Sequence, residues 1–130
     1  MMKLRTPLLS ALAIGLLATS FSAQAEGDWK KGRIYYRMTC TACHAAQGLE
    51  AIAPIGRTKA EWTAYLAADK HAKGKDSVKY FVSKKYRESV KGSNKAAAKY
   101  IDDSDAALME DVRAFIIRSA KDGEVPASCN

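Results

Sequence analysis

Histidine and cysteine, the side chains that most often hold a metal in proteins, are scarce here: the 130-residue chain has two histidines and three cysteines. A structural zinc site needs a second ligand pair at finger spacing, and outside one short motif only the scattered His71 and Cys129 remain. The sequence also lacks a phosphate-binding glycine loop, a nucleophile with an adjacent base, and paired carboxylates beside a histidine. We therefore expect a protein that is not an enzyme acting alone.

Long apolar runs are absent after residue 25, so we predict no membrane-spanning helix in the rest of the chain. Before that point, Lys3 and Arg5 precede the run LLSALAIGLLATSF, which is too short to span a bilayer and is followed by Ala23-Gln24-Ala25. This pattern predicts a secretory signal peptide over residues 1–25 and a single domain over residues 26–130. We expect a periplasmic protein, for which nucleic acid is a poor partner.

The whole chain carries a formal net charge of +7, and acidic residues are especially rare in one long segment. Between Lys70 and Lys99, only Asp76 and Glu88 oppose a series of lysine and arginine residues, whereas acidic residues crowd positions 102–111. This separation predicts an electric dipole that orients the molecule toward an acidic partner surface. A solvated face of lysine-rich helices explains the same pattern equally well.

Strand-rich segments and internal repeats are also absent, and helical signals dominate the chain. Asp28 can cap a helix that leads into Cys40, with apolar residues at helical spacing: Ile34, Tyr35 and Met38. Thr58 and Glu61 form a capping box that opens a second helix, whose apolar face comprises Trp62, Tyr65 and Leu66.

Further helices are predicted in the second half of the chain. Near-helical apolar spacing predicts one amphipathic helix over residues 77–90. Gly92 is a predicted helix stop, followed by a short helical turn over residues 96–101. Ser104 begins the clearest helix, which is predicted to end near Asp122-Gly123. The predicted fold class is all-α.

The motif MTCTACHAAQG, residues 38–48, places Cys40 and Cys43 two residues apart and His44 directly after them. A thioredoxin-like redox pair requires a βαβ setting that is absent, and a plain disulfide leaves the histidine as a coincidence. Covalent haem uses every residue, since two thiols add to the vinyl groups and the imidazole reaches the iron. We therefore predict one haem c, attached through Cys40 and Cys43 with His44 as the proximal axial ligand.

Three segments resemble the class I c-type cytochromes: KGRIYYRMTCTACHAAQG, AIAPIGR and DSDAALMEDVRAFIIRSA. The resemblance implies a class I cytochrome c-like fold of about four to five helices around the haem, with the C-terminal helix packed across the first. It also implies that Pro54 leans on the His44 ring and accepts its free N–H through the backbone. A simple loop-breaking role for Pro54 remains an equal alternative.

The sixth iron ligand of this family is usually a methionine before the last helix, and residues 92–103 contain none. Met38 and Met109 lie at positions more typical of a core. Cys129 is our first candidate for the distal ligand. His71 is the second, although it lies among lysines at a predicted helix end, where a solvated position is more usual. Asn94, Lys95 or an open site are the remaining alternatives.

These observations predict a periplasmic electron carrier that passes single electrons between redox partners, docking on acidic surfaces. The alternative is a haem protein that binds or senses NO or CO through unusual ligation, for example His/Cys; the apolar face of residues 77–90 would then roof the distal pocket. A dimer, or a subunit of a larger redox complex with the lysine-rich surface as the joint, is a third hypothesis.

Overall fold

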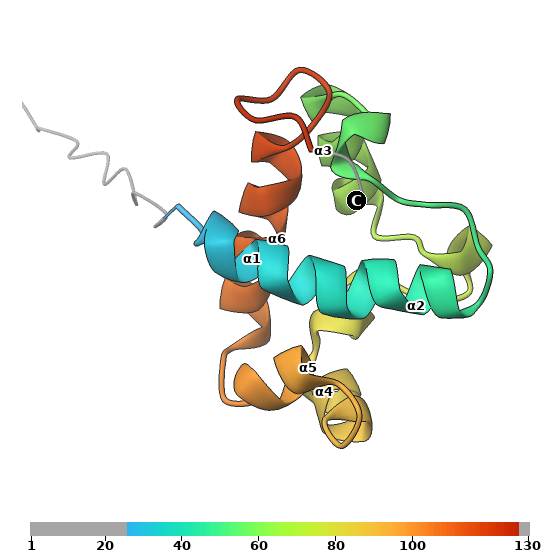
Figure 1. Cartoon of the computed structure of the whole chain (residues 1–130), viewed down its shortest axis with the longest axis vertical. Coiled ribbons are helices and arrows are strands. Elements are labelled where there is room, and N and C mark those ends of the chain that lie inside the picture. The colour runs from blue at the N-terminus through green and yellow to red at the C-terminus, as the bar shows by residue number, and fades with distance from the viewer. Residues whose placement is uncertain (1–25, 128–130) are drawn as a thin grey trace, which may run out of the picture.

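The computed structural model describes residues 26–127, and every element in this range is helical (Figure 1). The α-helices are α1 (Trp29–Tyr35), α2 (Ala42–Ala46), α3 (Lys59–Ala68), α4 (Lys84–Val90), α5 (Lys95–Lys99) and α6 (Asp105–Arg118). The other elements are a π-helix, η1 (Tyr36–Thr41), and the short 3₁₀ helices η2 (Pro54–Gly56), η3 (Ala72–Gly74) and η4 (Lys79–Val82). The all-α prediction is therefore confirmed for these residues.

Two predictions fall on residues outside this range: the signal peptide of residues 1–25, and Cys129 as a distal ligand. Within residues 26–127, no helix is both long enough and apolar enough to cross a membrane. The predicted absence of a membrane span is thus confirmed for the part of the chain that the structure describes.

The segments α1, η1 and α2 follow one another without a break and form a single helical rod (Figure 1). The predicted cap at its start is confirmed, because the Asp28 side chain accepts hydrogen bonds from the backbone N–H groups of Lys30 and Lys31. At the other end, Gly48 adopts a positive φ of 63° and Leu49 donates to the His44 carbonyl at 2.9 Å. This left-handed glycine ends the rod just after the motif.

The buried face of the rod differs from the predicted one. Tyr35 and Tyr36 are buried, whereas Ile34 and Met38 are 39% and 40% exposed. The prediction of Met38 as a core residue was therefore wrong. Met38 lies within η1, and a π-helical turn holds more residues than an α-helical turn and so changes the face on which they lie. Ile34 precedes η1, so the π-helix does not explain its exposure. Met109 does pack, partly buried, against the core, as its sequence position predicted.

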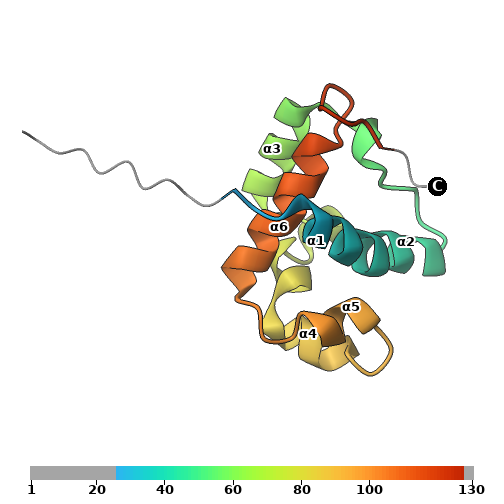
Figure 2. The ribbon, with the colours of Figure 1, turned by 60° about the vertical axis from the view of Figure 1, so that its left-hand side comes forward.

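Helix α6 crosses the rod at α1, and the two helices are in close contact (Figures 1 and 2). A Cβ atom added at Gly32 would lie 1.8 Å from the carbonyl oxygen of Asp111, so only glycine permits this approach. The crossing is further held by Lys31, which pairs with Asp103 at 2.6 Å and with Asp111 at 3.3 Å. The packing of the last helix across the first is as the resemblance implied.

Helix α3 lies beside α6 (Figure 2). The predicted capping box at its start is confirmed: Glu61 N–H donates to the Thr58 hydroxyl, and Thr58 N–H donates to the Glu61 carboxylate. Trp62 is buried, and Tyr65 and Leu66 pack against the core. The helix ends at Asp69, which adopts the left-handed conformation with a φ of 51°.

The single helix predicted over residues 77–90 was wrong, because the chain breaks at Ser83 into η4 and α4. Ser83 is extended, and its hydroxyl accepts a hydrogen bond from Tyr86 N–H, so it caps α4. Gly92 has no left-handed role, since Lys91 ends α4 and Asn94 caps α5. Ser104 caps α6 as predicted, but α6 ends at Arg118, earlier than predicted.

Arg87 of α4 is fully buried and ties the start of α6 to the preceding turn. Its guanidinium donates to the carbonyl oxygens of Tyr100, Ile101 and Asp103 and to the carboxylate of Asp105, the last at 2.6 Å. We refer to these groups as the Arg87 cluster. Because the carbonyls of an irregular turn need partners when they are buried, the Arg87 cluster stabilises residues 100–105.

Candidate functional site

The motif residues lie at the end of the rod, with Cys40 in η1 and Cys43 and His44 in α2. Helical residues three and four positions apart share a face, so Cys43 and His44 lie on the same side as Cys40. All three side chains are half-buried. Cys40 and Cys43 are both free thiols, so a disulfide between them is not part of this structure.

The Cys40 thiol lines an apolar cavity of about 70 Å³. The rod supplies Tyr36 and Cys40, and the segment between the rod and α3 supplies Ile52 and Arg57. The rest of the wall comes from α3, α6 and residues 71–82. Val78, Phe81 and Val82 are part of this wall, whereas Tyr86 and Val90 of the same predicted face do not line the cavity. Burial, reinforced by the neighbouring Cys43, raises the pKa of the Cys40 thiol to about 12.

The His44 ring is oriented by a backbone carbonyl. Its Nδ1 lies 3.0 Å from the carbonyl oxygen of Glu50. A carbonyl can only accept a hydrogen bond, so this contact assigns the proton to Nδ1 and leaves the lone pair of Nε2 free for a metal. An imidazole whose other nitrogen donates to a carbonyl is the usual arrangement of a histidine ligand.

The predicted partner of His44, the backbone of Pro54, is not the one observed. Pro54 is fully buried, and its carbonyl oxygen accepts a hydrogen bond of 2.7 Å from the indole N–H of Trp62. That carbonyl is therefore engaged with α3, and Glu50, nearer in sequence, takes the expected role. The sequence could not identify Glu50 as this partner, because every residue has a backbone carbonyl and the hydrogen bond does not depend on the side chain.

His71 was expected at a solvated helix end, and this expectation was wrong. The left-handed turn at Asp69 directs the chain back toward the rod, so the His71 ring lies 6.0 Å from the His44 ring and 4.6 Å from the Phe81 ring, centre to centre. Its Nδ1 is buried and has no hydrogen-bond partner among residues 26–127. Burial, and secondarily the nearby His44, lowers the pKa of His71, which favours the neutral imidazole.

The backbone at His71 is fixed as well. His71 N–H donates to the Asp76 carbonyl at 2.8 Å, and Asp76 N–H donates back at 3.2 Å, forming an isolated bridge. Phe81, which packs on the imidazole, belongs to an aromatic group with Tyr80 and Tyr86. The helix predicted over residues 77–90 placed Phe81 and Tyr86, but not Tyr80, on its apolar face. The clustering of aromatic residues in a lysine-rich segment was the feature of the sequence that could have predicted a cavity wall here.

The remaining candidates for a distal ligand have other roles. The Asn94 side chain caps α5 by accepting from Ala96 N–H and Ala97 N–H, and its amide donates to the Met38 carbonyl and the Thr39 hydroxyl. Lys95 is exposed to solvent. Neither side chain lines the cavity beside Cys40. Cys129, our first candidate, lies outside the described residues.

No group of three or more His, Cys, Asp or Glu side chains within residues 26–127 is arranged to hold a metal ion. This arrangement does not suit zinc, which takes three or four protein ligands. It does suit haem iron, because the porphyrin supplies the equatorial ligands and the protein supplies only the axial ones. Two thiols on one face, a histidine with a free Nε2 and a nearby buried imidazole nitrogen therefore fit a covalently bound haem.

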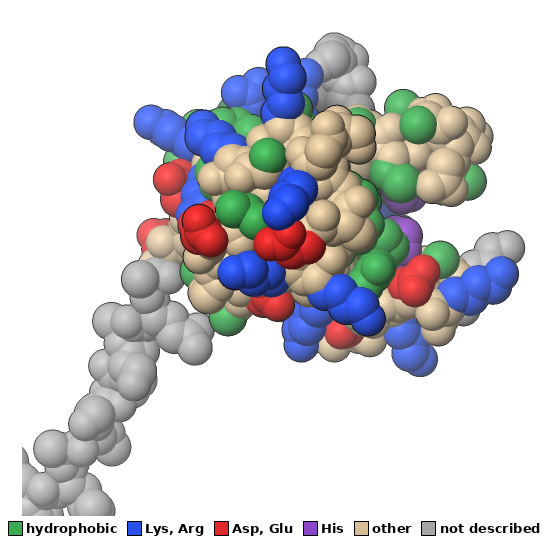
Figure 3. Space-filling model, turned by 90° about the horizontal axis from the view of Figure 1, so that it is seen from below, with side chains coloured by type: hydrophobic (Ala, Val, Ile, Leu, Met, Phe, Trp, Pro, Cys, Tyr) green, Lys and Arg blue, Asp and Glu red, His purple; other side chains and the backbone are tan. Residues whose placement is uncertain are grey.

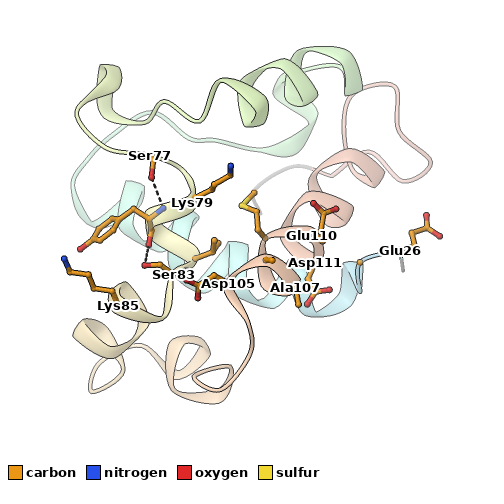
Figure 4. Close-up of a pocket in the computed structure, with 14 residues that line it drawn as sticks. Glu26, Ser77, Lys79, Ser83, Lys85, Asp105, Ala107, Glu110 and Asp111 are labelled. Carbon is orange, nitrogen blue, oxygen red and sulfur yellow. Dashed lines mark hydrogen bonds between the residues drawn. The ribbon is translucent and has the colours of Figure 1, made fainter. Parts of the chain in front are cut away.

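Histidine side chains are visible from outside in a notch of the surface, next to hydrophobic side chains (Figure 3). A larger, open hollow of about 1080 Å³ lies elsewhere, between segment 77–85, α6 and the residues before α1. In the close-up of this hollow, Lys85 lies at one end and Glu26 at the other, and the polar groups do not converge (Figure 4). None of the motif residues lines it, so we place the site at the cavity beside Cys40.

The predicted separation of charge is weaker in space than in sequence. Asp105 pairs with Arg87, and Asp102 lies 4.0 Å from the amino group of Lys84. Asp102 and Asp105 thus lie beside the bases of α4, whereas Asp103 pairs with Lys31 of α1. Basic and acidic side chains are mixed on the face seen in Figure 3. A docking role for the basic segment stays a prediction.

Comparison with known protein families, with characterised proteins and with solved structures found no match to this chain.

Proposed function

We propose that this protein is an exported c-type cytochrome, which carries one haem bound covalently to Cys40 and Cys43 and passes single electrons between redox partners. The observation that carries the proposal is the arrangement at the end of the rod. Two free thiols share a helical face with His44, whose Nδ1 contact with the Glu50 carbonyl leaves Nε2 available, beside an apolar cavity.

The attachment chemistry follows from the two thiols. Each S–H adds across one vinyl group, so a C–S bond forms, the hydrogen passes to the other vinyl carbon, and no oxidant is consumed. Once bound, the haem supplies a one-electron iron couple. His44 would hold the iron through Nε2, and the Glu50 carbonyl fixes the orientation of the His44 ring through Nδ1.

The size of the cavity sets the order of assembly. At about 70 Å³ it is smaller than the roughly 300–1,000 Å³ of pockets that enclose a ligand. The haem therefore requires the wall of residues 71–82 to stand apart from Cys40 during attachment. We expect attachment to precede the final packing of this wall, which then covers the apolar ring and lowers its contact with water.

The direct test is to express the full chain in a bacterial host that matures c-type cytochromes. We expect a coloured protein whose mass exceeds that of the polypeptide by one haem that denaturants do not release. Substituting both Cys40→Ser and Cys43→Ser should abolish covalent attachment. Ala42→Ser, an exposed position between the two cysteines, is the matched control and should leave it intact.

A colourless wild-type protein with the mass of bare polypeptide would refute the proposal. The electron-carrier assignment is tested separately on the coloured protein. A reversible one-electron couple without CO binding supports it, whereas rapid CO binding by the reduced form would favour the gas-binding alternative.

A further inference from the structure

We infer that His71 is the second axial ligand of the haem, so that the iron is held between the imidazoles of His71 and His44. The inference rests on the proposed function and identifies the group opposite His44. Three observations carry it: the spacing of the two rings, the unpartnered nitrogen of His71, and the position of His71 on the wall of the cavity beside Cys40.

The spacing of the rings suits a shared metal ion. Metal–imidazole bonds are about 2 Å long, so two rings on opposite sides of one metal have centres roughly 6 Å apart. The centres of the His44 and His71 rings are 6.0 Å apart. The two rings come from segments far apart in sequence, so this spacing is produced by the tertiary fold.

The unpartnered nitrogen needs an explanation of its own. Nδ1 of His71 is buried without a hydrogen-bond partner among residues 26–127. Buried polar atoms are nearly always paired. Thr41 Oγ1 and Arg87 Nε also lack a partner in this range, but of these residues only His71 lines the cavity beside Cys40, where a bound group can supply one. A neutral imidazole with a nitrogen free is a good ligand for iron.

His71 is also held in place by the fold. The reciprocal hydrogen bonds with Asp76 fix its backbone, and Phe81 packs against its ring. Among the donors considered from the sequence and present in the described range, Met38 is exposed on the rod and Asn94 caps α5. His71, by contrast, lines the same cavity as Cys40.

Ligation by His71 decides between the two functions predicted from the sequence. An iron with two imidazole ligands has no open position, so a diatomic gas cannot bind without displacing a ligand. Replacing the usual methionine by histidine also removes the ligand that raises the potential of c-type cytochromes. We therefore expect a low-potential electron carrier that is inert to CO.

The test compares the matured wild-type protein with His71→Ala, His71→Met and the neighbouring exposed control Lys70→Ala. Wild type and Lys70→Ala should show the low-spin paramagnetic resonance of bis-imidazole ferric haem and no CO binding when reduced. His71→Ala should keep its covalent haem, lose that low-spin signal and bind CO, and added imidazole should restore the signal.

His71→Met provides a second measurement if the alanine variant matures poorly. It should give the absorption band of methionine-ligated ferric haem and a higher potential than wild type. Covalent haem in wild type together with an unchanged low-spin signal in both His71 variants would overturn the inference and leave the proposed function standing. Absence of covalent haem from the wild type itself would instead overturn the proposed function.

Discussion

Two polar side chains with buried nitrogens, Arg87 and His71, differ in how many hydrogen bonds their surroundings supply. The guanidinium of Arg87 donates to three carbonyls and a carboxylate, all within residues 100–105. The Nδ1 of His71 has no partner in the described part of the chain, and its neighbours are the rings of Phe81 and His44.

The difference separates a structural cluster from a candidate site. A buried polar group stabilises a fold when its hydrogen bonds are made, and destabilises it when they are not. The two terminal nitrogens of Arg87 meet the first condition and link α4 to the start of α6, although its Nε has no partner in the described residues. His71 meets the second condition, because its Nδ1 makes no hydrogen bond in the described residues. Such an unpaired nitrogen is tolerable where a bound ligand contacts it. Substitutions in the two regions should therefore affect different properties: stability at Arg87, and the iron spectrum at His71.

The largest loss of stability is expected from Arg87→Met. This change removes the Arg87 donors from the carbonyls of Tyr100, Ile101 and Asp103 and from the Asp105 carboxylate, which keeps the backbone N–H of Lys84. Such losses cost about 3 kcal/mol. Because Arg87 does not line the cavity beside Cys40, the haem spectrum should stay unchanged. Denaturant unfolding of the matured protein measures the first effect. The control is Lys91→Met, at the exposed residue that follows α4. Equal stability of the two variants would contradict the stabilising role of the Arg87 cluster.

A smaller loss is expected from Gly32→Ala, which acts on the scaffold that both regions share. The new Cβ would lie 1.8 Å from the Asp111 carbonyl oxygen, and forcing α1 from α6 costs roughly 2 kcal/mol. Alanine is otherwise the better helix former, so an uncrowded site would be stabilised. Gly56→Ala is the control, because no atom lies within 4 Å of its Cβ position. Thermal unfolding should show a lower midpoint for Gly32→Ala alone.

Local signals allowed several elements to be predicted from the sequence. The caps at Asp28, Thr58 and Ser104 formed as expected, since each depends on hydrogen bonds among a few consecutive residues. The spacing of Cys40, Cys43 and His44 likewise sufficed to place them on one face. These features need no knowledge of the rest of the chain.

The errors concern features that tertiary contacts decide. The break at Ser83 accompanies the burial of Arg87, whose partners lie beyond α5. The altered face of the rod accompanies the π-helix, in which Tyr36 donates to the Ile52 carbonyl. The approach of His71 to His44 depends on a left-handed turn at Asp69, a conformation that aspartate tolerates but does not require. The spacing of apolar residues along the sequence does not predict such a turn.

The smallest effect is expected from Tyr35→Phe. Tyr35 lies on the rod and contacts Phe81, which lines the same cavity as His71. The Tyr35 hydroxyl donates to the Phe81 carbonyl at 2.5 Å, and losing this bond should cost about 1 kcal/mol at neutral pH. Burial raises the pKa of Tyr35 above its ordinary value, so the folded state retains the phenol proton more strongly than the unfolded state. Its contribution to stability is therefore complete below about pH 10 and is lost as the pH rises further.

The same variant should consequently unfold with a shallower dependence on alkaline pH than wild type, although it is less stable at pH 7. Urea unfolding between pH 7 and pH 11 measures both effects. The control is Tyr80→Phe, because the Tyr80 ring is exposed and packs against Phe81. The stability of this variant should follow the wild-type dependence on pH. If Tyr35→Phe kept the wild-type slope above pH 10, the phenol of Tyr35 would not be the proton that the folded state retains, and the link between rod and wall would rest on packing alone.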